Sequence, residues 1–151
     1  MLCDIGNGTM NVMFINEKKP NPAKCYTDKF GTHKCMLEVR ENLMRVHHTE
    51  PPEETITRVL RFGTADIDGA YLKTIADTAR EYAAGIFRKL RDYGYDPKLM
   101  KLYIVGGGGC LIRNFADYDE SRVTINADIC STAKGYERML KMKLLRSGGK
   151  V

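Results

Sequence analysis

The chain has 151 residues, of which 43% are hydrophobic and 28% charged, and its formal net charge is +5. This length predicts one domain, and the composition is ordinary for a globular protein. No run approaches the roughly 18 apolar residues of a membrane span, and the N-terminus lacks the basic region and long apolar core of a secretion signal. These features argue against a membrane partner and predict a cytoplasmic protein.

The chain begins with a predicted hairpin over residues 2–15, in which a Gly-Asn-Gly turn separates two short apolar strands. Residues 17–22 are polar and contain two prolines, which predicts a second turn. A third antiparallel strand is expected over residues 24–30. Gly31 and Thr32 then end this strand and supply the cap of a helix.

Three helices are predicted next. In residues 33–46 the apolar positions recur at steps of three and four residues, which indicates an amphipathic helix. Its inward positions are Met36, Val39, Leu43 and Val46. A proline-containing acidic stretch starts a short second helix that Gly63 closes. The third and longest helix is expected from Thr64 to Tyr93, where Gly94 signals a C-terminus.

The last third of the chain alternates strands and helices. Residues 99–105 predict a strand covered on both faces, and four glycines at 106–109 separate it from a short helix at 110–115. The last strand is expected at 123–125 and the last helix at 128–145. The positions expected on the inner face of that helix are Ala133, Tyr136, Leu140 and Leu144. Residues 147–151 read as a frayed tail.

Neither the five cysteines nor the basic residues near the C-terminus predict a functional site. The cysteines at positions 3, 25, 35, 110 and 130 form no CxxC pair, and their apolar neighbours predict buried free thiols. Arg138, Lys141 and Lys143 suit the last turns of a helix, where cations are favoured by the helix dipole. No base-stacking aromatic pattern accompanies them, so direct nucleic-acid binding is not expected.

The two glycine turns are the candidate functional elements. Asp4 ends the first strand, and Gly6, Asn7, Gly8 and Thr9 form the turn that follows. Glycines let a backbone approach phosphates closely, Thr9 and the amides can donate to oxygen anions, and Asp4 can hold a magnesium ion or its water. A plain hairpin turn has the same composition, and a tight strand-to-helix turn also explains the run at 106–109. The residues alone leave both interpretations open.

The predicted order, β-β-β-α-α-α-β-α-β-α, resembles the second lobe of the superfamily of actin, sugar kinases and heat-shock chaperones. Residues 4–9 resemble its second phosphate motif, and residues 104–109 resemble its adenosine motif. The residues of both motifs are similar to those of the ParM or StbA plasmid-segregation branch of bacterial actin-like ATPases. The resemblance covers residues 2–145 and implies an α/β, ribonuclease H-like lobe with a mixed five-stranded sheet and helices on both faces.

The resemblance also implies a role for individual residues. Asp4 would bind the magnesium-water shell and be the catalytic contribution of this lobe. The phosphate contacts would come from Gly6, Asn7, Gly8 and Thr9, and the ribose and adenine contacts from Gly107, Gly108 and Gly109. Arg58 or Arg61, on the short second helix, would reach the adenine from the far side. Asn11 departs from an aspartate that is common in relatives, and Asn7 from a glycine.

In this interpretation residues 1–146 form the second lobe and a first lobe is absent from the chain. The full-length parent would bind ATP and magnesium, polymerise with copies of itself, hydrolyse ATP and segregate plasmid DNA through a DNA-binding adaptor protein. Half of an ATP site is expected to be inactive on its own, because phosphoryl transfer needs groups from several sides. Two alternatives stay open: a small-molecule kinase of the same superfamily, and an actin-fold assembly module without turnover, of the division or pilus type.

Overall fold

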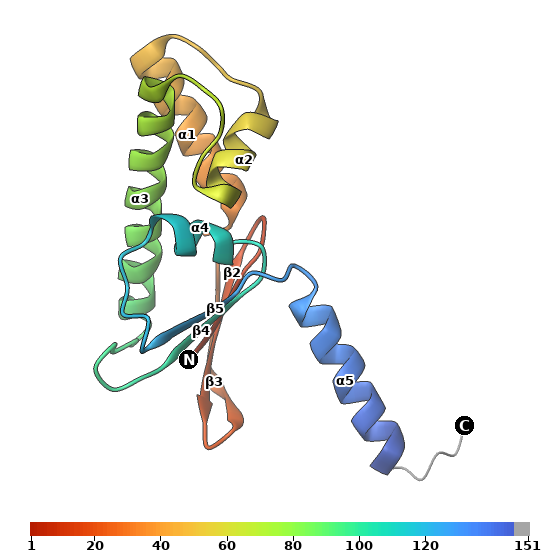
Figure 1. Cartoon of the computed structure of the whole chain (residues 1–151). Coiled ribbons are helices and arrows are strands. Elements are labelled where there is room, and N and C mark those ends of the chain that lie inside the picture. Colours follow the sequence, from red (N-terminus) through yellow and green to blue (C-terminus); the bar gives the residue numbers. More distant parts are fainter. Residues whose placement is uncertain (147–151) are drawn as a thin grey trace.

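A computed structural model describes residues 1–146 of the chain, so the expected frayed tail at 147–151 lies outside the described residues. The elements are β1 (Leu2–Ile5), β2 (Met10–Asn16), β3 (Lys19–Asp28), α1 (Thr32–His47), α2 (Glu53–Phe62), α3 (Gly69–Asp92), β4 (Leu102–Val105), α4 (Gly109–Phe115), β5 (Val123–Asn126) and α5 (Ser131–Arg146). This order confirms the one predicted from the sequence (Figure 1). In the described range, no helix combines the length and the apolar character needed to cross a membrane.

The strands form one mixed five-stranded sheet, as expected, and within it they lie in the order β3-β2-β1-β4-β5. The first three strands pair antiparallel, and the predicted hairpin places Ile5 opposite Met10. β4 joins β1 in parallel, and β5 joins β4 in parallel. Because parallel strands run in the same direction, the carboxyl ends of β1 and β4 lie side by side at one edge of the sheet.

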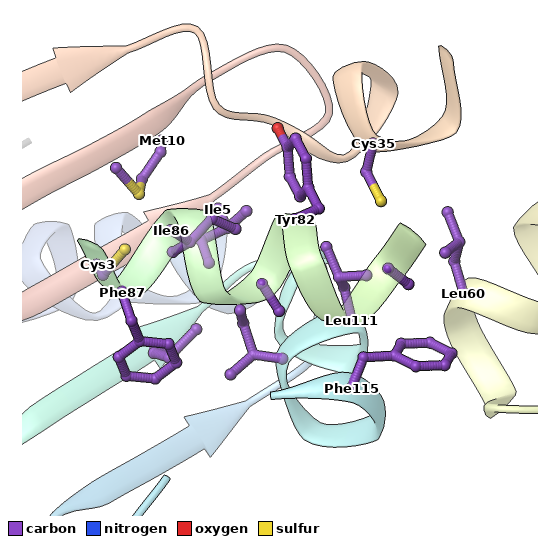
Figure 2. Close-up of a cluster of buried hydrophobic side chains, with 14 of the residues drawn as sticks. Cys3, Ile5, Met10, Cys35, Leu60, Tyr82, Ile86, Phe87, Leu111 and Phe115 are labelled. Atoms are coloured by element: carbon purple, nitrogen blue, oxygen red, sulfur yellow. The ribbon is translucent and has the colours of Figure 1, made fainter. Parts of the chain in front are cut away.

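One face of the sheet is packed and the other is open. Strand side chains that face α1 to α4 are buried, among them Cys3, Ile5 and Ile104, and Figure 2 shows some of them in a cluster with Tyr82 of α3 and Leu111 of α4. We expected helices on both faces, but α5 extends away from the sheet (Figure 1) and its side chains from 132 to 145 are exposed. The second face is therefore left without a packed helix.

The first strands differ from the prediction at the second turn. That turn consists of Glu17 and Lys18 alone, both with positive φ (49° and 65°), and β3 begins directly after it. Pro20 and Pro22, predicted to lie in the turn, belong to the strand instead. Proline is tolerated there because β3 is an edge strand and needs only one set of ladder hydrogen bonds.

Two element starts and one position expected to face inward also differ from the prediction. α3 begins at Gly69 rather than Thr64, because the carboxylate of Asp68 caps it by accepting a hydrogen bond from the Ala70 amide at 2.8 Å. β4 begins at Leu102 rather than at residue 99, because the amides of residues 99 and 100 bond back to the Asp96 carbonyl in a turn. Val46, expected to face inward, is 51% exposed.

The cysteines divide into two groups. Cys3 and Cys35 are fully buried, as expected, and burial raises the pKa of each thiol to about 12. Cys25 and Cys130 are exposed, contrary to the prediction, and Cys110 is intermediate. Cys25 lies on the edge strand and Cys130 precedes α5, where the neighbouring apolar residues are exposed too.

A polar cluster fastens the edge strand to the end of α3. The Tyr93 hydroxyl donates to the Asp28 carboxylate at 2.9 Å, and the Lys89 ammonium lies 3.2 Å from the same carboxylate. The Tyr93 ring also stacks on Tyr26 of β3, with ring centroids 4.3 Å apart. The hydrogen bond from Tyr93, followed by the contact with Lys89, lowers the pKa of Asp28.

We expect Tyr93→Phe to lower the free energy of unfolding at pH 7 by about 1 kcal/mol, the value of one hydrogen bond. Because the pKa of Asp28 is lowered in the folded state, its stabilising effect is present above the unfolded pKa of about 3.9 and is lost as the pH falls through the folded pKa. The difference between variant and parent should therefore shrink towards pH 2 in urea titrations. Tyr103→Phe, which removes a hydroxyl from a side chain that is 46% exposed, is the control.

Candidate functional site

The first glycine turn is a closed loop held against the start of α1. The Gly6 amide donates to the Thr9 carbonyl at 2.9 Å, which closes the turn. The amides of Thr32 and His33, the first two of α1, donate to the carbonyls of Gly6 and Asn7 at 3.1 and 2.9 Å. The N-terminus of α1 thus holds the loop in place.

Gly31 is essential to this arrangement, a role that sequence reasoning missed. A Cβ at position 31 would lie 2.2 Å from the carbonyl oxygen of Asn7. The sequence analysis assigned Gly31 only the end of a strand and part of a cap. Gly31 is indeed the N-cap, but no side chain caps the helix, and the Thr32 hydroxyl instead donates to the Asn7 side-chain oxygen at 3.3 Å.

The second glycine turn packs directly against the end of β1. Gly106 has φ +86°, and a Cβ there would lie 2.6 Å from Oδ1 of Asp4. The Gly108 amide donates to the Ile5 carbonyl at 2.9 Å, and a Cβ at position 108 would lie 2.2 Å from Cγ2 of Ile5. Both positions need glycine because the backbone comes so close to β1.

The helix after this turn supplies no anion site. α4 has seven residues, and the amides of Gly109 and Cys110 already donate to the carbonyls of Gly106 and Gly107. A Cβ on Gly109 would meet Ile125 at 3.0 Å, so this glycine faces the protein interior. The simpler explanation of the run, a tight strand-to-helix turn, accounts for Gly106, Gly108 and Gly109, whereas Gly107 is exposed.

A cavity of about 340 Å³ lies between the two loops and the helices α1, α2 and α4. Asn7 and Gly107 line it from the two loops, and Arg61 and Glu53 line it from α2. Arg58 does not line it: its guanidinium lies 5.7 Å from the ring centroid of Phe62, in a separate hollow. Of the two arginines named from the sequence, the structure therefore brings only Arg61 to the cavity.

Asp4 is half-buried beside the second loop and already has a hydrogen-bond partner. Its Oδ2 accepts from the Thr132 hydroxyl, in the first turn of α5, at 3.1 Å. No local motif marked Thr132, because the two residues are 128 positions apart. The Thr9 hydroxyl accepts a long hydrogen bond of 3.5 Å from the side-chain amide of Asn11. The side-chain oxygen of Asn11 in turn accepts a hydrogen bond from the Thr27 hydroxyl at 2.9 Å.

The residues present suit a magnesium ion held mainly by phosphates and water. Within residues 1–146 no group of three or more histidine, cysteine, aspartate or glutamate side chains is placed to hold a metal ion. Magnesium typically uses only one or two carboxylates together with waters and substrate phosphates. Asp4 fits that mode as a single carboxylate, and Gly8, where an added Cβ would meet nothing within 4 Å, leaves open space in the first loop.

No protein-family model matches the sequence, and no curated protein matches it either. Several solved protein structures do match the fold of this chain. Bacillus thuringiensis ParM with ADP is 17% identical with a TM-score of 0.59, over 85% of this chain and 41% of that chain. The archaeal actin homolog Ta0583 is 18% identical with a TM-score of 0.71, over 94% and 47%. A pCBH ParM, a non-polymerisable quadruple mutant, is 18% identical with a TM-score of 0.62, over 93% and 46%.

These similarities show the fold. The chain is an α/β lobe of the actin-like type, with the mixed five-stranded sheet that the sequence predicted. It spans less than half of the length of each of these solved structures.

Two glycine substitutions should separate the packing of the first loop from its open side. Gly31→Ala places a methyl group against the Asn7 carbonyl, and we expect it to lower the free energy of unfolding by about 2–3 kcal/mol, as overpacking does. Gly8→Ala meets no neighbour and should change it by less than about 0.5 kcal/mol. Urea denaturation followed by circular dichroism measures both, and equal losses would contradict the described contact.

Proposed function

We propose that the chain is the second nucleotide-binding lobe of a two-lobe actin-like ATPase that assembles into filaments and segregates plasmid DNA. The observation that carries this proposal is the position of the two glycine loops. They follow the adjacent parallel strands β1 and β4 and border one cavity. In open α/β sheets, ligands bind outside the carboxyl ends of strands at such a switch in strand order.

The nucleotide is proposed to bind with its phosphates on the first loop and its nucleoside in the cavity. Gly6, Asn7, Gly8 and Thr9 would surround the β- and γ-phosphates. Gly107 would lie against the nucleoside, while Gly108 and Gly109 shape the turn behind it. Of Arg58 and Arg61, Arg61 would reach the base, a proposal supported by its position in the lining of the cavity. The cavity volume falls within the usual range for small-molecule sites, and the solved Bacillus thuringiensis ParM structures include forms with ADP, ATP and AMPPNP.

Asp4 is proposed to hold water bound to a magnesium ion beside the phosphates. The ion, when bound, supplies positive charge that neutralises the phosphate oxygens. Asp4 stands at the junction of the two loops, because its Oδ1 adjoins Gly106. Its Oδ2 accepts a hydrogen bond from the neutral hydroxyl of Thr132, which a metal-bound water can replace as the donor.

The companion lobe is part of the proposal. Residues 1–146 would supply one side of the nucleotide site, and a first lobe would supply the opposite phosphate contacts and position the attacking water. Filament assembly, the DNA-binding adaptor and plasmid segregation belong to the whole protein. Their support is the fold shared with the ParM structures.

For the 151-residue chain alone we expect no ATP hydrolysis and no ATP binding tighter than millimolar, because contacts from one side seldom hold a triphosphate against its hydration. Isothermal titration calorimetry with ATP and magnesium measures the affinity. A micromolar dissociation constant would show that this lobe is sufficient by itself and would contradict the division of the site between two lobes.

In the full-length parent, Asp4→Ala should reduce ATPase activity by about 10- to 100-fold, the usual effect of losing an outer partner of a metal. Asp66→Ala, which removes an exposed carboxylate in the loop before α3, is the matched control and should leave the activity unchanged. Phosphate release and ATP-dependent sedimentation are the two measurements. A parent protein that does not sediment with ATP, and whose ATPase resists Asp4→Ala, would rule out the proposed function.

A further inference from the structure

A second cavity, of about 410 Å³, lies at the other end of the sheet from the two glycine loops. The second half of α3 forms one wall, and the chain from Phe115 to Val123 forms another; Figure 1 shows this end of α3 beside the chain that leads into β5. Val123 begins β5, so the cavity lies at the amino ends of the parallel strands β4 and β5. The glycine loops follow carboxyl ends, and among the described residues none lines both cavities.

The inner surface of this second cavity is apolar. Ala84 and Phe87 of α3, Phe115 of α4 and Val123 of β5 line it. Phe87, Phe115 and Val123 are only 9%, 8% and 6% exposed. A concave apolar surface of this volume is typical of sites for small molecules, in which a few polar groups fix the orientation of the ligand. The inner surface therefore suits an aromatic or branched apolar body.

The Tyr95 hydroxyl supplies one such polar group. Tyr95 lines the cavity and is only 5% exposed, yet its hydroxyl has no hydrogen-bond partner within residues 1–146. Arg122 and Asp119, two further lining residues, are among the charges that act on this hydroxyl, which places its oxygen on the cavity side of the ring. Burial raises the pKa of Tyr95, so the hydroxyl is protonated at neutral pH. Since buried hydroxyls normally have a partner, this donor is available to a ligand oxygen.

Three arginines line the cavity, and two of them have no acidic partner. Arg80 pairs with Asp77 at 2.5 Å. Arg122 donates to the carbonyl of Lys98 at 2.5 Å, a neutral group that leaves most of its N–H donors for other acceptors. The Arg91 side chain has neither a hydrogen bond nor an ion pair in the described part of the chain. Arg91 and Arg122 therefore present positive charge that the lobe itself does not pair.

Two aspartates in the lining limit the charge of a suitable ligand. Asp119 is turned toward its own loop, where its Oδ1 accepts from the amide and the hydroxyl of Ser121 at 2.8 and 2.6 Å. Asp117 is the second. Three arginines and two aspartates give the lining a net charge of +1. This charge matches a monoanion, whereas a doubly charged phosphate would be repelled by two carboxylates.

Backbone hydrogen bonds hold the polar wall in place. The amides of Arg122 and Val123 both donate to the Asp119 carbonyl at 2.9 Å, and the Leu102 amide donates to the Arg122 carbonyl at 2.9 Å. The contact of Arg122 with the Lys98 carbonyl joins the loop before β5 to the loop before β4. Donors that are positioned before binding lower the cost of ordering a site around its ligand.

We propose that this second cavity binds a carboxylate carried on an aromatic or branched apolar body. The body would lie against Phe87 and Phe115, and the carboxylate would accept from the Tyr95 hydroxyl and from the guanidinium groups of Arg91 and Arg122. A guanidinium matches the planar, two-oxygen geometry of a carboxylate. The same chemistry occurs in free arylalkanoic acids and at a polypeptide that ends in an aromatic residue. The site does not depend on the proposed ATPase.

Titration of the isotope-labelled 151-residue chain with 3-phenylpropionate should shift the backbone amide resonances around the second cavity, with a dissociation constant of about 0.1–1 mM for a ligand of this size. The neutral 3-phenylpropanamide is the matched control and should bind at least tenfold more weakly. N-acetyl-Gly-Phe carries the same carboxylate on a peptide. Tighter binding of this peptide would support a polypeptide terminus as the source, and tighter binding of the free acid would support a small molecule. Inorganic phosphate should shift none of these resonances.

Substitutions test the individual contacts. Tyr95→Phe removes only the unpartnered hydroxyl, so it should weaken binding about tenfold and leave the free energy of unfolding unchanged. Arg122→Gln should also weaken binding about tenfold, and Arg91→Gln, at an exposed position, about threefold. Arg113→Gln, exposed on α4 and outside the lining, and Tyr103→Phe are the matched controls and should bind like the parent. If Arg122→Gln unfolds because it loses its backbone contact, the Tyr95 and Arg91 variants decide.

Four results would each overturn the proposal. They are no shift with either acid, equal binding of the acid and its amide, shifts confined to the glycine loops, and an affinity that neither Tyr95→Phe nor Arg91→Gln changes. None of these results depends on whether the full-length parent hydrolyses ATP, so the proposed function and this site fail separately.

Discussion

The parallel pairing of β1 with β4 is the constraint on which the candidate site depends. Just beyond the paired residues, the Gly108 amide donates a hydrogen bond to the Ile5 carbonyl, which ties the second glycine loop to the residue that precedes the first loop. The requirement for glycine at 106 and 108 follows from this closeness, since a side chain there would collide with Asp4 or Ile5. The same few backbone contacts therefore stabilise both the candidate site and the fold.

The first loop is coupled to the helical layer as well. Its carbonyls are held by the first amides of α1, and the buried Tyr82 hydroxyl of α3 donates to the Gly31 carbonyl at 2.7 Å just before that helix. Burial raises the pKa of Tyr82, so its phenol stays protonated and remains a donor. α3 therefore helps to position the first loop through Gly31, the residue just before α1.

Much of the fold was predictable because local sequence patterns indicate it. These patterns include the hairpin, the apolar spacing of α1 and α2, and the order of elements. Contacts between distant residues were not predictable. Position 31 requires glycine because the Asn7 carbonyl, 24 positions earlier in the sequence, lies against it. The Thr132 hydroxyl donates a hydrogen bond to Asp4, which is 128 positions earlier. Arg58 and Arg61 differ by three positions on one helix, and only the packing of α2 on α4 decides which one faces the cavity. The face of α5 was mistaken for an inner one because periodicity reveals a stripe but not its partner.

The early start of β3 has a consequence for how copies of this chain can associate. Pro20 and Pro22 lie in an outer strand and carry no backbone N–H. A neighbouring chain that tried to lengthen the sheet at this margin would find an incomplete row of donors. Growth into a continuous intermolecular sheet is thereby blocked along that stretch, and ordered assembly is directed to surfaces made of side chains, whose identity can specify the partner.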